Sequence, residues 1–368
     1  MAGICGTDVH LWKGELPITL PVILGHETTG RLEAVGEGFD TDWTGQPLGP
    51  GDRVTWNSSL ACGQCYYCKE KGQPTRCPKR RAYGIGYRCD QPPHWLGGYA
   101  DYHCLLPGAT VFKLPDNLPD EAVIGAGCAL ITAIHGVERI CAETQGRAAL
   151  TDPIPTELPT LPELWRDHVV VQGAGPVGLA ALAVAREAGA RHITVVGAPA
   201  ARLDIARRFG ADQTINLEDM PEAKDRVARV LELTGGQGAD TVLECVGHPS
   251  VIEEGMAMCR DGAKYLVLGH YCDAGPVSFN PHTITRKQLQ VFGSWSSEPR
   301  HLRMSLGLLA TKRDRYPFDS LVTHRFAIEE ANEALATTAR WESAKSVIIP
   351  SFASTSSASE GRPGKGAS

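Results

Sequence analysis

The sequence contains no block of basic residues. Its 36 lysines and arginines are outnumbered by 42 aspartates and glutamates, which gives a formal net charge of −6. Proteins that bind nucleic acid or anionic membranes carry clustered positive charge. We therefore expect neither nucleic acid nor a membrane as a partner.

Targeting and membrane-spanning features are missing as well. No apolar run is long enough to cross a bilayer, and the first residues, MAGICGTD, lack the charged and apolar regions of a signal peptide. The expected location is the cytoplasm. Disulfides are rare there, so the 12 cysteines need another explanation, and metal binding is the first to test.

The first part of the chain, to about residue 128, is rich in turn-forming residues. It predicts short strands at 21–24 and 52–56, and a helix follows over 121–139. A proline-rich insert at 141–166 forbids a helix or a central strand there. With 368 residues, the chain favours two domains.

From residue 168 the pattern changes to alternating strands and helices. The predicted strands are 168–172, 193–196, 214–216, 240–244 and 264–268, and the predicted helices are 176–189, 200–209 and 220–234. This alternation predicts a parallel sheet wrapped by helices. A helix and a strand at 344–349 are expected within 297–350, and residues 351–368 have the composition of a disordered tail.

Residues 173–178 (GAGPVG) follow a predicted strand and open a predicted helix, the context in which a G-x-G-x-x-G pattern binds a dinucleotide. Gly173 permits the tight turn, Gly175 lets the backbone approach a pyrophosphate, and Gly178 lets helix and strand pack closely. Pro176 and Val177 begin the helix, whose free N–H groups favour phosphate. The alternative is a glycine turn without a ligand.

The residues that follow the next predicted strand, 193–196, slightly favour NADP over NAD as the cofactor. Gly197 stands where an acid normally binds the ribose hydroxyls, which removes repulsion against a 2′-phosphate. Arg202 is near enough in sequence to pair with such a phosphate. Arg202 is equally compatible with a solvated position on its helix.

Four closely spaced cysteines predict a closed zinc site. Cys62, Cys65, Cys68 and Cys77 supply four thiolates from one loop, and such a tetrahedral site has no open position for substrate. Its role is therefore structural. The alternative, a zinc ribbon that binds nucleic acid, is disfavoured by the acidic balance of the chain.

A second, dispersed set of possible ligands consists of Cys5, His26 and Cys128. Two thiolates and an imidazole leave one corner of a tetrahedron open, which is the arrangement of a catalytic zinc site. Such residues are common, so spacing alone leaves unrelated positions equally possible.

Five motifs occur here in one order: residues 3–10 (GICGTDVH), 25–27 (GHE), the cysteines at 62–77, 173–178 (GAGPVG) and 240–247 (DTVLECVG). Together they resemble the zinc-containing medium-chain dehydrogenase/reductase family, from residue 1 to about 350. The resemblance implies an α/β protein with a doubly wound Rossmann sheet and a β-rich GroES-like catalytic domain. Relative to that family, the chain begins close to the first motif, as if the first strands were lacking.

The resemblance implies a domain division and an activity. Residues 1–128 and 297–350 form the catalytic zinc domain, and 129–296 form the NAD(P)-binding domain. The activity is reversible hydride transfer between a primary or secondary alcohol and NAD(P), with one catalytic and one structural Zn²⁺. The expected assembly is a homo-oligomer, a dimer or tetramer.

Residue roles follow from the same resemblance. Cys5, His26 and Cys128 are the catalytic zinc ligands, and Glu27 lies behind the metal and enters its shell as ligands exchange. Asp8 orients the ligand histidine. Thr7 takes the alcohol proton and His10 ends the relay to solvent, although His10 is also compatible with a surface position.

Three other functions remain possible at this point. A zinc-free quinone or enone reductase on the same fold would not need Cys5, His26 or the four-cysteine loop. A relic that binds NAD(P) and zinc without turnover would retain the fold but lose the open site. A zinc-ribbon nucleic-acid binder would show salt-sensitive binding.

Overall fold

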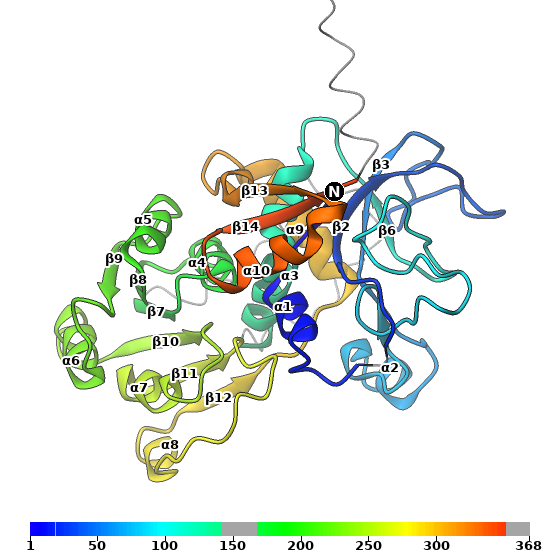
Figure 1. Cartoon of the computed structure of the whole chain (residues 1–368). Helices are drawn as coiled ribbons and strands as arrows, with labels where there is room; N and C mark the ends of the chain where they lie inside the picture. The colour runs from blue at the N-terminus through cyan, green and yellow to red at the C-terminus, as the bar shows by residue number, and fades with distance from the viewer. Residues whose placement is uncertain (19, 141–167, 351–368) are drawn as a thin grey trace, which may run out of the picture.

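The structure is a computed structural model, and it describes residues 1–18, 20–140 and 168–350. The predicted insert at 141–166 and the predicted tail at 351–368 lie outside the described residues. The described chain is organised around two six-stranded sheets, with helix α3 between them (Figure 1).

The first sheet combines both ends of the described chain. Its strands are β1 (Ala2–Gly3), β2 (Glu27–Arg31), β3 (Arg53–Trp56), β6 (Val111–Lys113), β13 (Val322–Ala327) and β14 (Lys345–Ile349), in the order β13-β14-β1-β2-β3-β6. The pair β13–β14 is parallel and the other pairs are antiparallel. β1 therefore pairs with β14 on one side and β2 on the other, which brings residues from opposite ends of the sequence together.

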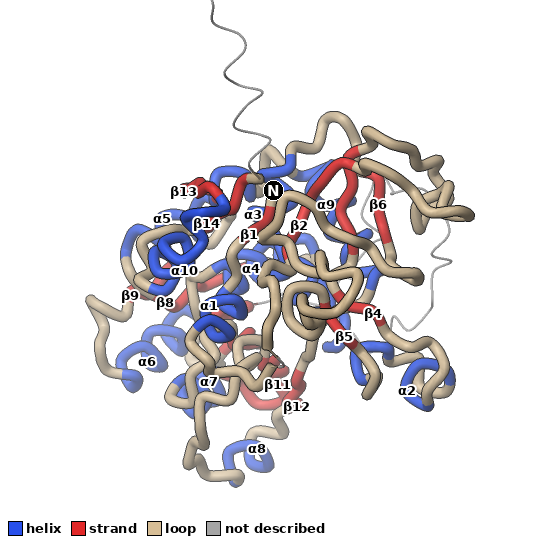
Figure 2. Tube along the Cα trace, turned by 45° about the vertical axis from the view of Figure 1, so that its right-hand side comes forward, coloured by secondary structure: helices blue, strands red, loops and turns tan. Residues whose placement is uncertain are grey.

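Helices and short elements surround this sheet. They are α1 (Gly6–Trp12), the hairpin strands β4 (Ser59–Leu60) and β5 (Arg81–Ala82), α2 (Tyr66–Lys69), the 3₁₀ helices η1 (Pro74–Arg76), η2 (Phe318–Leu321) and η3 (Ile328–Glu330), and α10 (Ala331–Ala339). Figure 2 shows β4, β5 and α2 together at one side of the molecule, where the cysteine loop lies.

The second sheet is parallel throughout, as the alternating pattern predicts. Its strands are β7 (His168–Gln172), β8 (His192–Gly197), β9 (Gln213–Asn216), β10 (Ala239–Glu244), β11 (Cys259–Val267) and β12 (Gln290–Gly293), in the order β12-β11-β10-β7-β8-β9. The chain runs outward from β7 to β9 and then returns to β10 beside β7. Ligands of such doubly wound sheets bind where the strand order reverses, at the ends of β7 and β10.

Helices accompany this sheet, as expected for the predicted Rossmann arrangement: α4 (Pro176–Glu187), α5 (Ala200–Arg208), α6 (Ala223–Leu233), α7 (Val251–Met258), α8 (His282–Arg286) and α9 (Pro299–Lys312). α4, α5 and α7 contact its strands, α6 and α8 pack on α7, and α9 packs on α3. The largest apolar core joins α3, α4, α9 and strands β7 and β8; Leu130, Ile134 and Leu182 are almost fully buried in it. α6 begins at Ala223 rather than 220, since Pro221 disfavours helical backbone in the residue before it.

The predicted strand at 21–24 is wrong. These residues form a loop, and separate loops rather than one neighbouring strand satisfy their backbone: Cys89 N–H donates to the Pro21 carbonyl at 3.0 Å and Tyr99 N–H donates to the Leu24 carbonyl at 2.9 Å. Pro21 has no N–H to donate to a ladder. The run is apolar without being part of a sheet.

From the sequence we expected no apolar run long enough to cross a bilayer, but helix α3 (Asp120–Ile140) is long and apolar enough by length and composition. By length and composition it is the single candidate among the described residues, and 72% of its most apolar window is buried inside the structure. This burial is what a core helix shows. α3 packs against elements of both sheets.

Candidate metal centre and dinucleotide site

Four side chains from three distant segments converge on one point. Ligand atoms of Cys5, His26, Glu27 and Cys128 lie within 4.8 Å of one another. Cys5 is the N-cap of α1, Glu27 begins β2 directly after His26, and Cys128 lies within α3. The structure thus brings together the dispersed set that spacing alone left open.

A break in α3 positions Cys128. Gly127 has a non-helical backbone (φ 47°, ψ −149°), and a Cβ at this position would lie 2.3 Å from Oε1 of Glu27. A side chain is therefore excluded by backbone strain and by contact. The break lets the Cys128 N–H donate to Glu27 Oε1 at 2.7 Å and leaves the Cys128 sulfur 3.3 Å from that of Cys5.

Asp8 holds the other two ligands in place. Its fully buried carboxylate accepts the Cys5 N–H at 2.9 Å and lies 3.2 Å from Nδ1 of His26. A carboxylate accepts, so Nδ1 carries the proton and Nε2 keeps the lone pair that a metal needs. Burial alone would lower the pKa of His26, but Asp8 raises it well above its usual value, so a zinc ion would bind Nε2 by displacing a proton from it.

Glu27 is engaged by a partner that the sequence did not reveal. The ammonium of Lys345, on β14, forms a buried ion pair with the Glu27 carboxylate across 318 positions of sequence. Burial opposes ionisation of Glu27, yet Lys345 lowers the pKa of that carboxyl below its usual value. In this arrangement Glu27 borders the ligand cluster while its carboxylate is ion-paired with the ammonium of Lys345. The one sequence signal was a lysine near the start of the predicted strand at 344–349.

The donor set fits a zinc ion. The Cys5 and Cys128 sulfurs are too far apart for a disulfide, whose bond is about 2 Å long. The hydrogen bond with Cys128 lowers the pKa of the Cys5 thiol well below its usual value, so the pair readily holds a thiolate. Two sulfurs and one imidazole nitrogen leave one position open on a tetrahedral ion.

The predicted four-cysteine cluster also forms. Cys62, Cys65, Cys68 and Cys77 bring their sulfurs within 4.8 Å of one another, with Cys65–Cys68 and Cys62–Cys77 each separated by 3.5 Å. Sulfurs on a zinc ion with bonds of about 2.3 Å are about 3.8 Å apart, so the cluster fits a tetrahedral ion. With four protein ligands, no position remains open.

The two predicted proton-relay residues lie on α1. Thr7 is half-buried in its first turn, two positions after Cys5. His10 is 42% exposed in its side chain, and its Nδ1 pairs with the carboxylate of Glu15. The structure therefore places His10 at the solvent side of the helix, with an acidic partner that the sequence analysis did not identify.

The glycine loop has the predicted strand–turn–helix form. Gly173 has φ 104°, and a Cβ on Gly178 would lie 1.9 Å from the Gly173 carbonyl oxygen, so both positions need glycine for the turn itself. Gly175 is different: a Cβ there would meet nothing closer than Nη1 of Arg202, at 3.7 Å. The space above Gly175 is what a pyrophosphate would occupy, while Pro176 and Val177 open α4.

Arg202 lies at this loop rather than in open solvent. Its guanidinium lies over the ring of Trp341, 4.8 Å from the centroid, and next to Gly175. Gly197 ends β8 beside the loop, where a Cβ would be 3.0 Å from the Ala174 backbone nitrogen. Burial lowers the pKa of Arg202. Trp341 was not predicted, because it is 139 positions away (341 − 202).

Comparisons with known proteins agree with this geometry. Residues 1–116 match the alcohol dehydrogenase GroES-like domain model, and residues 176–311 match the zinc-binding dehydrogenase model. The 5-exo-hydroxycamphor dehydrogenase of Pseudomonas putida is 36% identical over 91% of this chain and 86% of the relative.

Solved structures are similar over nearly the whole chain. An alcohol dehydrogenase from Thermotoga maritima has a TM-score of 0.84 and 33% identity, covering 95% of this chain and 90% of that one. A zinc-binding dehydrogenase from Sinorhizobium meliloti, solved with NADP, has a TM-score of 0.73 and 26% identity over 95% and 90% of the two chains. Together with the family models, these relatives make the chain a dehydrogenase-type oxidoreductase. It belongs to the zinc-containing medium-chain dehydrogenase/reductase family.

Proposed function

We propose that this protein is a zinc-dependent alcohol dehydrogenase that transfers a hydride between a primary or secondary alcohol and NAD(P), reversibly with the aldehyde or ketone. The observation that carries the proposal is the convergence of Cys5, His26 and Cys128 around one point, with Asp8 fixing the ring of His26. Three ligands on a tetrahedral ion leave room for a substrate oxygen.

The proposed roles follow from where each side chain lies. Cys5, His26 and Cys128 hold a zinc ion that, when bound, supplies Lewis-acid chemistry to the alcohol oxygen. Asp8 keeps the proton on Nδ1 of His26. Thr7 accepts the alcohol proton, and His10 passes it to solvent from its exposed position on α1. Glu27 balances the charge of the site through Lys345 and serves as an exchange ligand.

We propose NADP as the preferred cofactor, bound by Gly173, Gly175, Pro176, Val177 and Gly178. Two observations support this preference. No acid stands at Gly197, and Arg202 lies beside Gly175 without an acidic partner among the described residues. A guanidinium in that position suits a 2′-phosphate.

We also propose a domain organisation, an assembly and a location for the protein. Residues 1–128 with 297–350 are the catalytic unit and 129–296 the cofactor unit, in a homo-oligomer, dimer or tetramer. A structural zinc is held by Cys62, Cys65, Cys68 and Cys77. Reduced zinc thiolates favour the cytoplasm, where thiols stay reduced.

Zinc analysis combined with activity tests this function. The purified chain should contain two zinc equivalents and oxidise members of an alcohol panel with NADP or NAD. Cys5→Ala and His26→Ala should each lose one equivalent and turnover but retain cofactor binding, whereas Cys68→Ser should lose the other equivalent. Full activity in Cys5→Ala would refute the proposed centre. Two zinc equivalents with no turnover on any alcohol would favour the alternative, a non-catalytic relic of the fold.

A further inference from the structure

A buried ion pair joins the candidate metal centre to the last strand of the first sheet. Glu27 begins β2 and Lys345 begins β14, and their side chains are 2% and 4% exposed. In the order β14-β1-β2 one strand separates them, so β14 and β2 are about 9.6 Å apart. The two side chains therefore meet by reaching toward each other across β1.

Gly3, on β1, leaves the space in which this ion pair forms. It lies opposite Glu27 in the sheet, and a Cβ at this position would be 2.6 Å from Glu27 Oε2 and 3.0 Å from Lys345 Cε. A side chain on Gly3 would therefore displace one partner of the pair. Three adjacent strands thus cooperate to bring the ammonium to the carboxylate.

Both carboxylate oxygens of Glu27 are engaged, although the group lies within reach of the metal position. Oε1 accepts the Cys128 N–H at 2.7 Å, and Oε2 binds the Lys345 ammonium. A Glu27 oxygen also lies within 4.8 Å of the ligand atoms of the three-ligand centre, formed by Cys5, His26 and Cys128. Ligand atoms that share a tetrahedral zinc ion are about 3.6 Å apart, so a shift of roughly 1 Å would make Glu27 a fourth ligand.

We propose that Lys345 is a positioning residue: its ammonium holds Glu27 outside the fourth position of the three-ligand centre, so that this position stays open for the substrate oxygen. The inference rests on the proposed dehydrogenase function and names what regulates access to its metal. Loss of the Lys345 charge would leave the Glu27 carboxylate buried without a compensating cation, which is strongly unfavourable. A metal ion within about 1 Å of binding distance would then attract the carboxylate into the open position.

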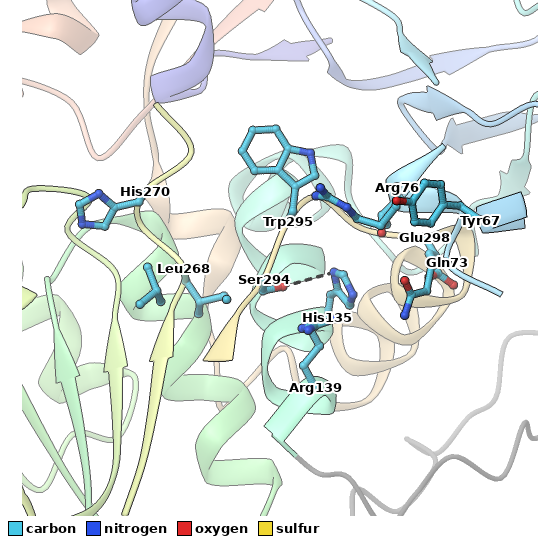
Figure 3. A pocket seen from close by; sticks show the side chains of 13 residues that line it. Tyr67, Gln73, Arg76, His135, Arg139, Leu268, His270, Ser294, Trp295 and Glu298 are labelled. Atoms are coloured by element: carbon cyan, nitrogen blue, oxygen red, sulfur yellow. Dashed lines mark hydrogen bonds between the residues drawn. The ribbon is translucent and has the colours of Figure 1, made fainter. Parts of the chain in front are cut away.

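The arginines of the pocket beside the four-cysteine loop do not replace Lys345 in this role. Figure 3 shows Arg76 and Arg139 around that pocket, whose volume is about 480 Å³. Glu27 and Lys345 do not line it, and neither arginine binds Glu27 within residues 1–18, 20–140 and 168–350. Without Lys345, the Glu27 carboxylate can therefore be neutralised by the metal or by a proton, and these two outcomes can be distinguished.

Cobalt substitution and imidazole binding test the position directly. Co²⁺ replaces Zn²⁺ in the three-ligand centre of the full chain, and its visible absorption bands report the atoms that bind it and their geometry. Imidazole is the probe, because its nitrogen binds such an ion at an open position. The wild type should bind imidazole saturably. Lys345→Met should change the bands before imidazole is added and should bind imidazole about tenfold more weakly, as expected if the position is open in about one tenth of the molecules.

Three further variants make the result specific. Lys345→Arg keeps the cation and should behave as the wild type does. Lys345→Met combined with Glu27→Gln should recover wild-type affinity for imidazole, because the amide carries no charge that draws it to the metal. Lys113→Met, which removes a lysine paired with Asp52 at another strand of the same sheet, is the matched control and should leave the bands and the affinity unchanged.

Two results would overturn the positioning role. One is a folded Lys345→Met protein with the bands and imidazole affinity of the wild type, which would mean that Glu27 takes a proton and stays in place. The other is weak binding that persists in the double variant. If Lys345→Met does not fold, Glu27→Gln alone decides: unchanged imidazole affinity supports a carboxylate already held outside the metal shell, and about tenfold tighter binding refutes it.

Turnover separates this inference from the proposed function. In an active enzyme, Lys345→Met should raise KM about tenfold while kcat changes little, because Glu27 competes for the position at which the alcohol binds. A wild type that oxidises no alcohol, but whose imidazole binding depends on Lys345, refutes the dehydrogenase and retains the positioning role. Equal KM and kcat in an active wild type and Lys345→Met do the reverse. A three-ligand centre that takes up neither Zn²⁺ nor Co²⁺ would overturn both.

Discussion

The Asp8 carboxylate joins two candidate ligands: one oxygen lies 3.2 Å from Nδ1 of His26, and the other accepts the Cys5 backbone N–H at 2.9 Å. One buried group therefore fixes the orientation of an imidazole and the start of α1. In metal sites, partners of this kind tune the affinity of the ligands that they hold.

Asp8→Asn should weaken zinc binding at the Cys5–His26–Cys128 centre by about 10- to 100-fold, because an amide cannot accept both N–H groups as a carboxylate does. Chelator competition would measure this, with the four-cysteine site as an internal reference. Asp120→Asn, which removes one side of a partly exposed ion pair with Arg53, is the control. Unchanged affinity at both sites in Asp8→Asn would contradict the role of this residue.

Alanine substitution should have different effects at two glycines of one loop: it should destabilise the fold at Gly178 and weaken cofactor binding at Gly175. Gly178→Ala places a Cβ 1.9 Å from the Gly173 carbonyl oxygen, and we expect it to lower the free energy of unfolding by about 3 kcal/mol. Gly175→Ala has room in the protein and should fold normally, but its methyl group occupies the proposed path of the pyrophosphate.

Thermal unfolding and cofactor titration distinguish these two variants. Gly175→Ala should keep the wild-type melting temperature while binding dinucleotide at least about tenfold more weakly. Dinucleotide binding at wild-type strength in a folded Gly175→Ala protein would show that the loop does not approach the cofactor.

Arg202→Gln should shift cofactor choice. Loss of the guanidinium removes a charge-assisted pair with a 2′-phosphate, so KM for NADP should rise about tenfold while KM for NAD changes little. Arg207→Gln, on the same helix but exposed and paired with Asp204, provides the control. Trp341→Ala should produce a smaller shift in the same direction, because Trp341 only supports Arg202. Equal changes for both cofactors would contradict the assignment.

The carboxyl group of Glu138 should make a pH-dependent contribution to the free energy of unfolding. Burial opposes its ionisation, but hydrogen bonds from His301 and Arg300 hold the pKa of Glu138 at about 2 in the folded protein. An unfolded glutamate has a pKa of about 4.3, so the folded state is stabilised above that pH and loses this contribution as the pH falls toward 2.

Glu138→Gln should therefore lower the free energy of unfolding by about 2 kcal/mol at pH 7, a figure already reduced for partial exposure of the site. Urea unfolding at several pH values should show that the difference in unfolding free energy between Glu138→Gln and the wild type becomes smaller below about pH 4.3. Glu342→Gln, which removes an exposed partner of Arg340, is the control and should leave the free energy of unfolding nearly unchanged. A gap that stays constant down to pH 3 would argue against a charged Glu138.

Features that depend on neighbouring residues were predictable from the sequence. The four cysteines lie within one loop, and the glycine loop joins a strand to a helix, so local spacing alone brings Cys62 near Cys77 and Gly173 near Gly178. The alternation of strands and helices after residue 168 predicted the parallel sheet, because strand and helix periodicities are properties of short segments.

Apolarity by itself was a poorer guide. The run at 21–24 has strand-like composition, yet its carbonyls are bound by two separate loops. Helix α3 mixes charges with apolar residues, and its burial between two sheets explains why a core helix can have the mean hydropathy of a membrane span. In both cases the deciding factor is what packs against the segment, which composition does not contain.

Local sequence patterns were sufficient to predict the cysteine cluster, the glycine turn and the alternating sheet, since each is encoded within short segments of consecutive residues. The dispersed ligand set was expected only through the family resemblance, and it forms through the tertiary fold. Cys5 meets Cys128 across 123 positions, and Lys345 meets Glu27 across 318, because β1 pairs with β14 and α3 breaks at Gly127. Such contacts depend on the path of the whole chain, and no local pattern specifies them.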